Sequence, residues 1–325
     1  MRTTSFWLLA LALGAPAAGY GQIQVVNITP ASLSSETGID SEPNLAVDPA
    51  NPLRMAASAF TPDPMGGANA PIYVSTDGGS TWTLNSTLPG NDPTYGTGDI
   101  TLRFGGTSGI LYTGILVGGD FLHLNVLRAS SFTAATPMEV LVDRLTVDQP
   151  YVQAATVMGG ADFGKDRIYV GNNDRAPASP GKTATIDRTL DGATAPAPSG
   201  FSRFPIETRS TSGFDGPPIR PAIHADGTVY GIFYRYTSFT SGLQTADVVV
   251  IRTDDWGSGA TPFTNLTDSS DTLSGRMVVT GRSVPAFPAN IGQNRLVSSN
   301  LSIAVDPRTS SRVWIAWADR VGTTD

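Results

Sequence analysis

One short sequence occurs twice in the chain, and this repeat restricts the possible folds more than any other feature. Ala-Val-Asp-Pro stands at residues 46–49 and again at 304–307, and in both copies an arginine follows the aspartate by six residues. A short apolar segment comes next, at residues 55–60 and 313–317. Each copy therefore predicts a strand, an Asp-Pro turn and a second strand. A supersecondary unit that recurs along a chain is typical of propellers and solenoids.

Weaker copies of this unit lie between the two clear ones. Their paired strands are predicted at residues 101–104 and 110–117, 151–155 and 167–170, and 220–224 and 228–234. The units thus begin near residues 44, 100, 150, 219 and 301. Each interval has room for two further strands, of which residues 70–75 and 247–252 are the clearest. Four antiparallel strands in each unit is the architecture of a β-propeller blade.

The composition agrees with an all-β chain. Glycine and proline contribute 35 and 24 of the 325 residues, which argues against long helices. We therefore expect a β-propeller of four-stranded antiparallel blades, with about four and a half blades between residues 22 and 325. We favour truncation within the fifth blade, and the alternatives are that residues 23–28 supply an outer strand of the last blade or that the sheets form a solenoid.

Several classes of protein are excluded by the residues that the chain lacks. It has no cysteine, which excludes disulfide scaffolds, thiol nucleophiles and cysteine-based zinc sites. Its two histidines leave little for a histidine metal site. The net charge of −7 makes nucleic acid an unexpected partner.

The first 21 residues have the pattern of a signal peptide. Arg2 precedes an apolar run at residues 6–13, and small residues follow it. The run is shorter than the roughly 20 residues that span a bilayer, and we expect no membrane span elsewhere. The sequence therefore predicts cleavage near residues 17–22 and a secreted or periplasmic domain over residues 22–325.

Residues 75–82 match the pattern S-x-D-x-G-x-x-W at every fixed position, through Ser75, Asp77, Gly79 and Trp82. This pattern is the Asp box, or bacterial neuraminidase repeat, and on it the sequence resembles the sialidase-like β-propeller family. The resemblance implies a structural turn between the third and fourth strands of a blade, with Asp77 bound to backbone N–H groups and Trp82 packed between blades. Residues 252–257 and 189–192 are more degenerate versions of the same turn.

The resemblance also implies what a sialidase active site would need. Members of the family hold the sugar carboxylate with three arginines and use a tyrosine nucleophile, a glutamate that activates it, and an aspartate as acid and base. The family's Phe-Arg-Ile-Pro signature is absent ahead of the Asp box. Arg220 and Arg295 are the candidate carboxylate clamps, and Glu207 is the candidate base.

A different set of residues indicates ligand binding without catalysis. An acidic residue precedes the predicted first strand of four units, at Glu42, Asp99, Asp148 and Asp215. If these carboxylates form a ring at one mouth of the propeller, they suit a cation, with Ca²⁺ as the candidate, or a polyhydroxyl ligand such as a glycan. The alternative is that each carboxylate caps a turn in its own blade. Such a ring would repel sialic acid.

Three functions are therefore in competition. The first is a secreted propeller that binds a glycan or another extracellular ligand without catalysis. The second is an exo-α-sialidase type of glycoside hydrolase, and the third is an extracellular scaffold for protein partners. The side chains that line the axial mouth of the propeller separate the three.

Overall fold

The computed structural model describes residues 25–28, 41–60, 72–85, 97–117, 123–134, 136–175, 183–197, 200–209, 211, 218–285 and 301–318. The predicted signal peptide lies outside these residues. Residues 25–28, which belong to the proposed outer strand, are described and do not form a strand. Within the described ranges, no helix is long and apolar enough to cross a membrane.

The described residues form five antiparallel sheets, each built from strands that are consecutive in the chain. The first sheet holds β1 (Ser41–Val47), β2 (Met55–Phe60), β3 (Ile72–Ser75) and β4 (Thr83–Asn85). The second holds β5 (Thr97–Phe104), β6 (Leu111–Val117), β7 (His123–Ala129) and β8 (Glu139–Leu145). The third holds β9 (Val147–Thr156), β10 (Asp166–Asp174), β11 (Thr183–Thr189) and β12 (Ser202–Pro205).

The fourth sheet holds β13 (Arg220–Ile223), β14 (Val229–Thr240), β15 (Leu243–Thr253) and β16 (Arg276–Pro285). The fifth has two strands in the described residues, β17 (Leu301–Asp306) and β18 (Thr309–Trp317). A 3-10 turn at Asp255–Gly257 interrupts the loop that joins β15 to β16. These sheets start close to the predicted unit starts, and the predicted fold class, a β-propeller with four-stranded antiparallel blades, is confirmed.

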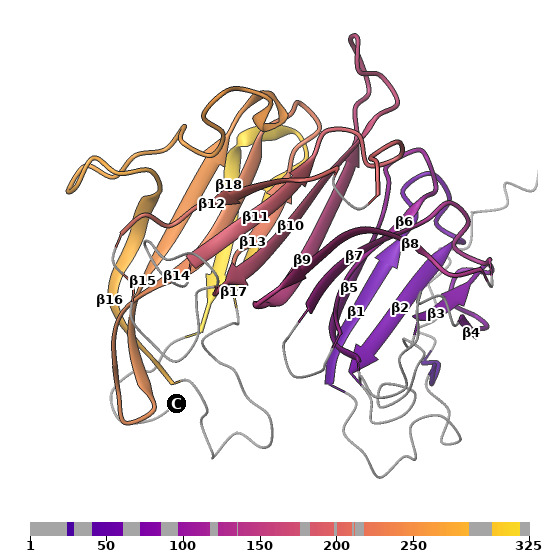
Figure 1. Ribbon diagram of the computed structural model, residues 1–325, viewed down its shortest axis with the longest axis horizontal. Coiled ribbons are helices and arrows are strands. Elements are labelled where there is room, and N and C mark those ends of the chain that lie inside the picture. Colours follow the sequence, from indigo (N-terminus) through magenta and orange to yellow (C-terminus); the bar gives the residue numbers. More distant parts are fainter. Residues whose placement is uncertain are drawn as a thin grey trace, which may run out of the picture.

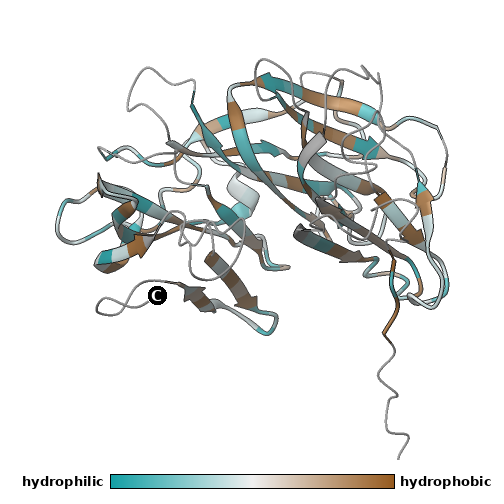
Figure 2. Cartoon of the chain, turned by 90° about the horizontal axis from the view of Figure 1, so that it is seen from below, coloured by the Kyte–Doolittle hydropathy of each residue, from teal (hydrophilic) through white to brown (hydrophobic). Residues whose placement is uncertain are grey.

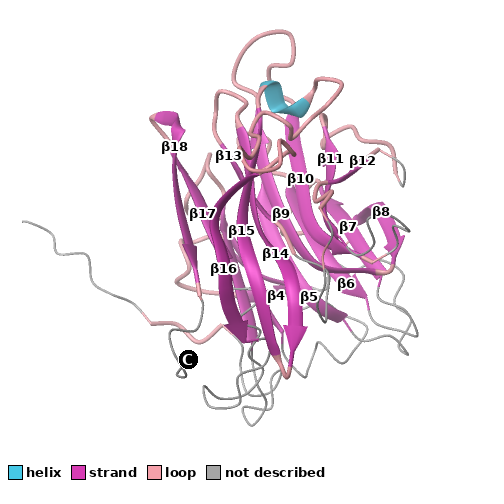
Figure 3. Cartoon of the chain, turned by 90° about the vertical axis from the view of Figure 1, so that its left-hand side faces the viewer, coloured by secondary structure: helices cyan, strands magenta, loops and turns pink. Residues whose placement is uncertain are grey.

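The sheets follow one another in chain order, with their first strands towards the middle of the molecule (Figure 1). The first strand of each sheet contacts the first strand of the next, from β1 to β5, β9, β13 and β17. The strand axes have similar orientations, with neighbouring strands antiparallel, and loops lie at both ends of the strands (Figure 3). Apolar and polar segments alternate along the strands rather than dividing the molecule into two sides (Figure 2).

The hydrophobic core is divided among the interfaces between sheets. One cluster joins the first and second sheets, and the others join the second to the third, the third to the fourth and the fourth to the fifth. Since an inner sheet has a neighbour on both faces, its central strands are covered on both sides. All nine residues of β10 are buried for this reason.

Three tyrosines at equivalent positions join consecutive sheets. In each of these sheets, the last residue of the third strand pairs with a residue of the second strand. The tyrosine comes directly after that paired residue. The hydroxyl of Tyr112 donates to Asp166 Oδ2 of the next sheet over 2.8 Å. Tyr169 and Tyr230 likewise donate to the carbonyls of Trp256 and Ser310, over 2.8 and 2.9 Å. Each bond gives a buried tyrosine hydroxyl a partner on the next sheet.

The repeated Asp-Pro turn has the same ion pair in both copies. The Asp48 and Asp306 carboxylates lie 3.5 and 3.1 Å from the guanidinium groups of Arg54 and Arg312. The other carboxylate oxygen accepts the N–H of a residue two positions later in each case. The arginine that follows each aspartate by six residues therefore closes a turn.

Residues 75–82, which match the Asp-box pattern, form the turn between β3 and β4. Asp77 Oδ1 accepts the Thr81 N–H over 2.9 Å, and Asp77 Oδ2 accepts the Thr81 hydroxyl over 2.6 Å. Ser75 Oγ accepts the Gly79 N–H over 2.9 Å. Gly79 has a φ of +87°, which favours glycine at this position. Trp82 is half-buried, and its Nε1 donates to the Gly79 carbonyl of its own turn over 2.9 Å. The packing of Trp82 between blades stays a prediction.

Replacing Tyr169 with phenylalanine tests the bonds between sheets. Tyr169→Phe removes one hydrogen bond from a buried interface and leaves the packing of the ring in place. We expect the free energy of unfolding to fall by about 1 kcal/mol, measured as a lower denaturant midpoint with an unchanged slope. Tyr230→Phe should behave in the same way at the next interface. Two variants as stable as the wild type would contradict this role of the hydroxyls.

The Asp box gives stability a dependence on pH. The Thr81 hydroxyl is the main cause that lowers the pKa of Asp77 to about 2, with help from the Thr81 N–H and Ser75. Because the folded pKa lies below the ordinary value near 3.8, the contribution of Asp77 is present above that pH and is lost as pH falls towards 2. Asp77→Asn cannot titrate, so its melting temperature should fall less than that of the wild type between pH 5 and about pH 2. Parallel melting curves for the two proteins would refute this expectation.

Candidate functional site

A cluster of polar side chains lies where the first strands of the first four sheets meet. On β5 and β9, polar residues alternate with buried apolar ones, and the polar positions are half-buried. The polar members from the four strands are Asn44, Asp99, Thr101, Arg103, Gln149, Tyr151, Gln153 and Arg220. Alternation along a strand places such residues on one side. We call this set the axial cluster.

Tyr151 lies at the centre of the axial cluster. The guanidinium carbon of Arg220 lies 4.7 Å from the centre of its ring, and that of Arg103 lies 5.5 Å from it. Arg103 also donates to the Tyr151 hydroxyl over 3.3 Å. Cations within about 6 Å of an aromatic ring are attracted to its face. The tyrosine thus holds two guanidinium groups from two other sheets close together.

Arg103 is further fixed by hydrogen bonds on both sides. Its Nη1 donates to the Leu102 carbonyl over 2.6 Å and to Asn44 Oδ1 over 3.3 Å. Its Nε donates to Gln153 Oε1 over 3.4 Å. Asn44 Oδ1 also accepts the N–H of Leu102, which ties β1 to β5. The first three sheets therefore hold this guanidinium group in one orientation.

Gln149 links the remaining polar groups. Its Nε2 donates to Asp99 Oδ2 over 2.8 Å, and its Oε1 accepts from Arg220 Nη2 over 3.4 Å. One side chain thereby connects β5, β9 and β13. The axial cluster presents guanidinium donors, a carboxylate, amides and a phenol ring within one region, which is a suitable set for hydrogen bonding a ligand rich in hydroxyl groups.

A buried ionic network lies between the second and third sheets. Arg144 of β8 bonds to Asp174, to Asp187 Oδ2 over 2.6 Å and to Asn172 Oδ1 over 3.0 Å. Arg203 Nε adds a contact of 2.7 Å to Asp174. Burial raises the pKa of Asp187, and Arg144 and Asn172 oppose that rise. The network ties β10 and β11 to the preceding sheet.

The acidic residues predicted to form one ring have different surroundings. Asp99 belongs to the axial cluster. The side chain of Asp148 instead pairs with Arg175 over 3.0 Å, although Asp148 precedes Gln149 in the chain. Glu42 falls within β1, but its side chain lies outside the described residues, as does all of Asp215. The ring of four carboxylates therefore stays a prediction.

The candidates implied by the sialidase resemblance also separate. Arg220 belongs to the axial cluster, and Arg295 lies outside the described residues. Glu207 is fully buried, and its Oε1 accepts the Arg209 N–H over 2.6 Å. Burial raises the pKa of Glu207, while its bonds to Arg209 act in the opposite direction. Arg209 also pairs with Asp271 over 2.6 Å, so Glu207 helps to anchor the loop between β15 and β16.

Sequence reasoning missed Arg103, Gln149 and Tyr151 as site residues. No motif marks them, and the acidic residues attracted attention because they recur near the unit starts. The available signal was the alternation of polar and apolar residues along residues 99–104 and 149–153. In a strand that is covered on both faces, polar residues at alternate positions need a wet or hydrogen-bonded environment.

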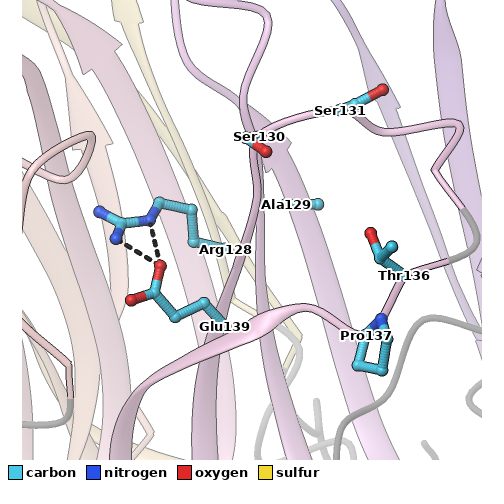
Figure 4. A pocket seen from close by; sticks show the side chains of 7 residues that line it. All are labelled: Arg128, Ala129, Ser130, Ser131, Thr136, Pro137 and Glu139. Carbon is cyan, nitrogen blue, oxygen red and sulfur yellow. Dashed lines mark hydrogen bonds and ion pairs between the residues drawn. The ribbon is translucent and has the colours of Figure 1, made fainter.

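A hollow of about 110 Å³ lies at the turn between β7 and β8, beside Arg128 and Glu139 (Figure 4). Arg128 Nε and Nη2 bond to Glu139, and Nη1 bonds to the Gly192 and Ala193 carbonyls, so the guanidinium group anchors the third sheet.

Among the described residues, no group of three or more His, Asp or Glu side chains could hold a metal ion. Ca²⁺ binding stays a prediction.

Comparison with known proteins identifies the fold. No protein-family model and no curated protein matches the chain. The GH93 α-L-arabinofuranosidase of Fusarium graminearum, solved with arabinobiose, matches with a TM-score of 0.52 and 12% identity, over 89% of this chain and 77% of that chain. An α-L-arabinanase of Penicillium chrysogenum, also complexed with arabinobiose, matches with a TM-score of 0.46 and 17% identity, over 75% and 70% of the two chains.

At these identities the likeness shows the fold and does not transfer an activity. The match with a TM-score of 0.52 is to an α-L-arabinofuranosidase, whereas the Asp-box pattern drew attention to sialidases. The chain thus shares the β-propeller fold of the Fusarium protein.

Removing Arg144 should destabilise the third sheet. Arg144→Met leaves the Asp174 and Asp187 carboxylates buried without the positive charge of Arg144. The loss of one partner from a buried ion pair typically lowers the free energy of unfolding by about 3–5 kcal/mol at neutral pH. Burial already raises the pKa of Asp187, so protonation favours the folded state and the deficit should shrink as pH falls towards about 4. Denaturant unfolding at several pH values measures this.

Lys165→Met is the matched control, because Lys165 and Asp162 form an exposed pair at 2.6 Å. It should change stability little at any of these pH values. An Arg144→Met deficit that stays constant on acidification would contradict the role assigned to the buried carboxylates.

Proposed function

We propose that the protein is a glycan-binding β-propeller whose ligand occupies the axial cluster. The observation that carries this proposal is the convergence of Arg103, Tyr151 and Arg220 from three different sheets. An aromatic ring with hydrogen-bonding groups around it suits a sugar, since a sugar offers apolar C–H groups to the ring and hydroxyls to the polar atoms. The predicted signal peptide supports a place for this activity outside the cytoplasm.

Binding without hydrolysis is the form of the proposal that the described residues favour. Most glycoside hydrolases use two carboxyl groups, about 5–5.5 Å apart in retaining enzymes and about 6.5–9.5 Å apart in inverting ones. Among the cluster members in the described part of the chain, Asp99 is the one carboxylate. Asp148 is engaged with Arg175, and Glu207 is engaged with Arg209.

The second candidate is a glycoside hydrolase, and two observations favour it. The fold matches a propeller that acts on arabinose-containing glycans. In addition, Arg103 and Arg220 lie beside a tyrosine, and arginine pairs suit a sugar carboxylate of the kind that an exo-α-sialidase holds. A scaffold for extracellular protein partners is the third possibility, and it requires no intact axial cluster.

Ligand binding by wild-type protein and two variants tests the proposal. We expect wild-type protein to bind members of a panel that contains arabino-oligosaccharides, neutral hexose oligomers and sialyllactose. Tyr151→Ala removes the ring, and Arg220→Gln removes one guanidinium group. Each should weaken binding by about tenfold or more, because each removes contacts worth more than about 1.4 kcal/mol.

Arg308→Gln serves as the control, since the Arg308 side chain is 85% exposed on the turn between β17 and β18. It should bind as the wild type does. Failure of wild-type protein to bind any member of the panel would reject the proposal. Turnover of arabinoside or sialoside reporters by the same preparations, abolished by Arg220→Gln, would replace binding with hydrolysis.

A further inference from the structure

Gln149 has a backbone conformation that is unfavourable for its residue type. Its φ is +55°, in the left-handed region that residues with a side chain rarely adopt. Such a conformation costs free energy and persists where the surrounding structure enforces it. Gln149 lies within the long strand β9, where an extended conformation is the ordinary one.

The local sheet register accounts for this conformation. Tyr151 of β9 pairs with Gly171 of β10, and Asp148 pairs with Asn173. Two residues of β9, at positions 149 and 150, therefore lie opposite the single residue at position 172. This is a β-bulge, which rotates a side chain away from the direction that a regular strand would give it.

The bulge aims the Gln149 carboxamide at two charged groups on other sheets. Its nitrogen donates to Asp99 on β5 over 2.8 Å, and its oxygen accepts from Arg220 on β13 over 3.4 Å. A carboxylate can only accept, and a guanidinium group can only donate. A carboxamide carries one group of each kind, whereas a glutamate at this position has no donor for Asp99 when ionised.

We propose that Gln149 is a positioning residue for the ligand of the axial cluster, and that the strained bulge is retained for this purpose. The inference rests on the proposed glycan binding. In this view, Gln149 holds Asp99 and Arg220 in the orientation in which they bond to sugar hydroxyls. Its effect on affinity is therefore exerted through these two groups.

Glycine substitution separates positioning from a structural role. Gln149→Gly accepts the left-handed φ without strain but removes the carboxamide. The matched control is Thr146→Gly, because Thr146 has a φ of +60° and its hydroxyl bonds, among the described residues, to the adjacent Leu145 carbonyl alone. Both variants relieve strain and add backbone freedom in the unfolded state, so their melting temperatures should agree within about 3 °C.

The two variants should differ in affinity for the glycan that wild-type protein binds best. We expect Gln149→Gly to weaken binding by about tenfold, whereas Thr146→Gly binds as the wild type does. Calorimetric titration gives the dissociation constants, and thermal unfolding of the same samples gives the melting temperatures.

Three other outcomes would refute the positioning role of Gln149, and one of them would also refute the proposed function. Wild-type affinity in Gln149→Gly would refute the positioning role and leave the proposed function in place. A large fall in melting temperature with unchanged affinity would show that Gln149 is structural. Wild-type protein that binds no glycan in the panel would refute the proposed function, and the positioning role with it.

Discussion

The inner sheets of this protein are each covered by a neighbouring sheet on both faces, and the rest of the structure depends on that constraint. A single four-stranded sheet would expose two apolar faces to water, whereas a series of sheets buries them against one another. The four hydrophobic clusters lie between consecutive sheets for this reason. The tyrosines at positions 112, 169 and 230 add a hydrogen bond to three of these interfaces.

The same constraint determines where polar chemistry can occur. Strands in the middle of a sheet are covered on both faces, so a polar group there needs a partner, as Asp174 and Asp187 have in Arg144. Polar residues also gather where first strands meet, and there they bond to one another across sheets. The axial cluster contains Arg103, Arg220 and Asp99, so it is locally cationic in a protein whose net charge is −7. An anionic or neutral ligand can therefore approach it more easily than the overall charge would indicate.

Much of the fold followed from the sequence, because repeats and turns have local signals. The Asp-Pro turns, the unit starts and the residues of the Asp box are all encoded within a few residues of one another. The site was harder to predict, because it is assembled from different sheets. Arg220 and Asp99 were recognised as candidates, but Gln149 was not, since a bulge is invisible in a single strand. The bond between the Trp82 indole and the Gly79 carbonyl of its own turn likewise had no signal in the sequence.

The order of the strands has a consequence for the way in which the chain reaches its folded state. Every sheet is made from strands that follow one another along the chain, and each sheet packs on the one made just before it. The loops that must close to form a sheet are therefore those between consecutive strands, and the entropy lost in closing a loop grows only slowly with its length. A sheet that forms early offers a surface on which the next can assemble, so order can spread from neighbour to neighbour, as it does in repeat proteins.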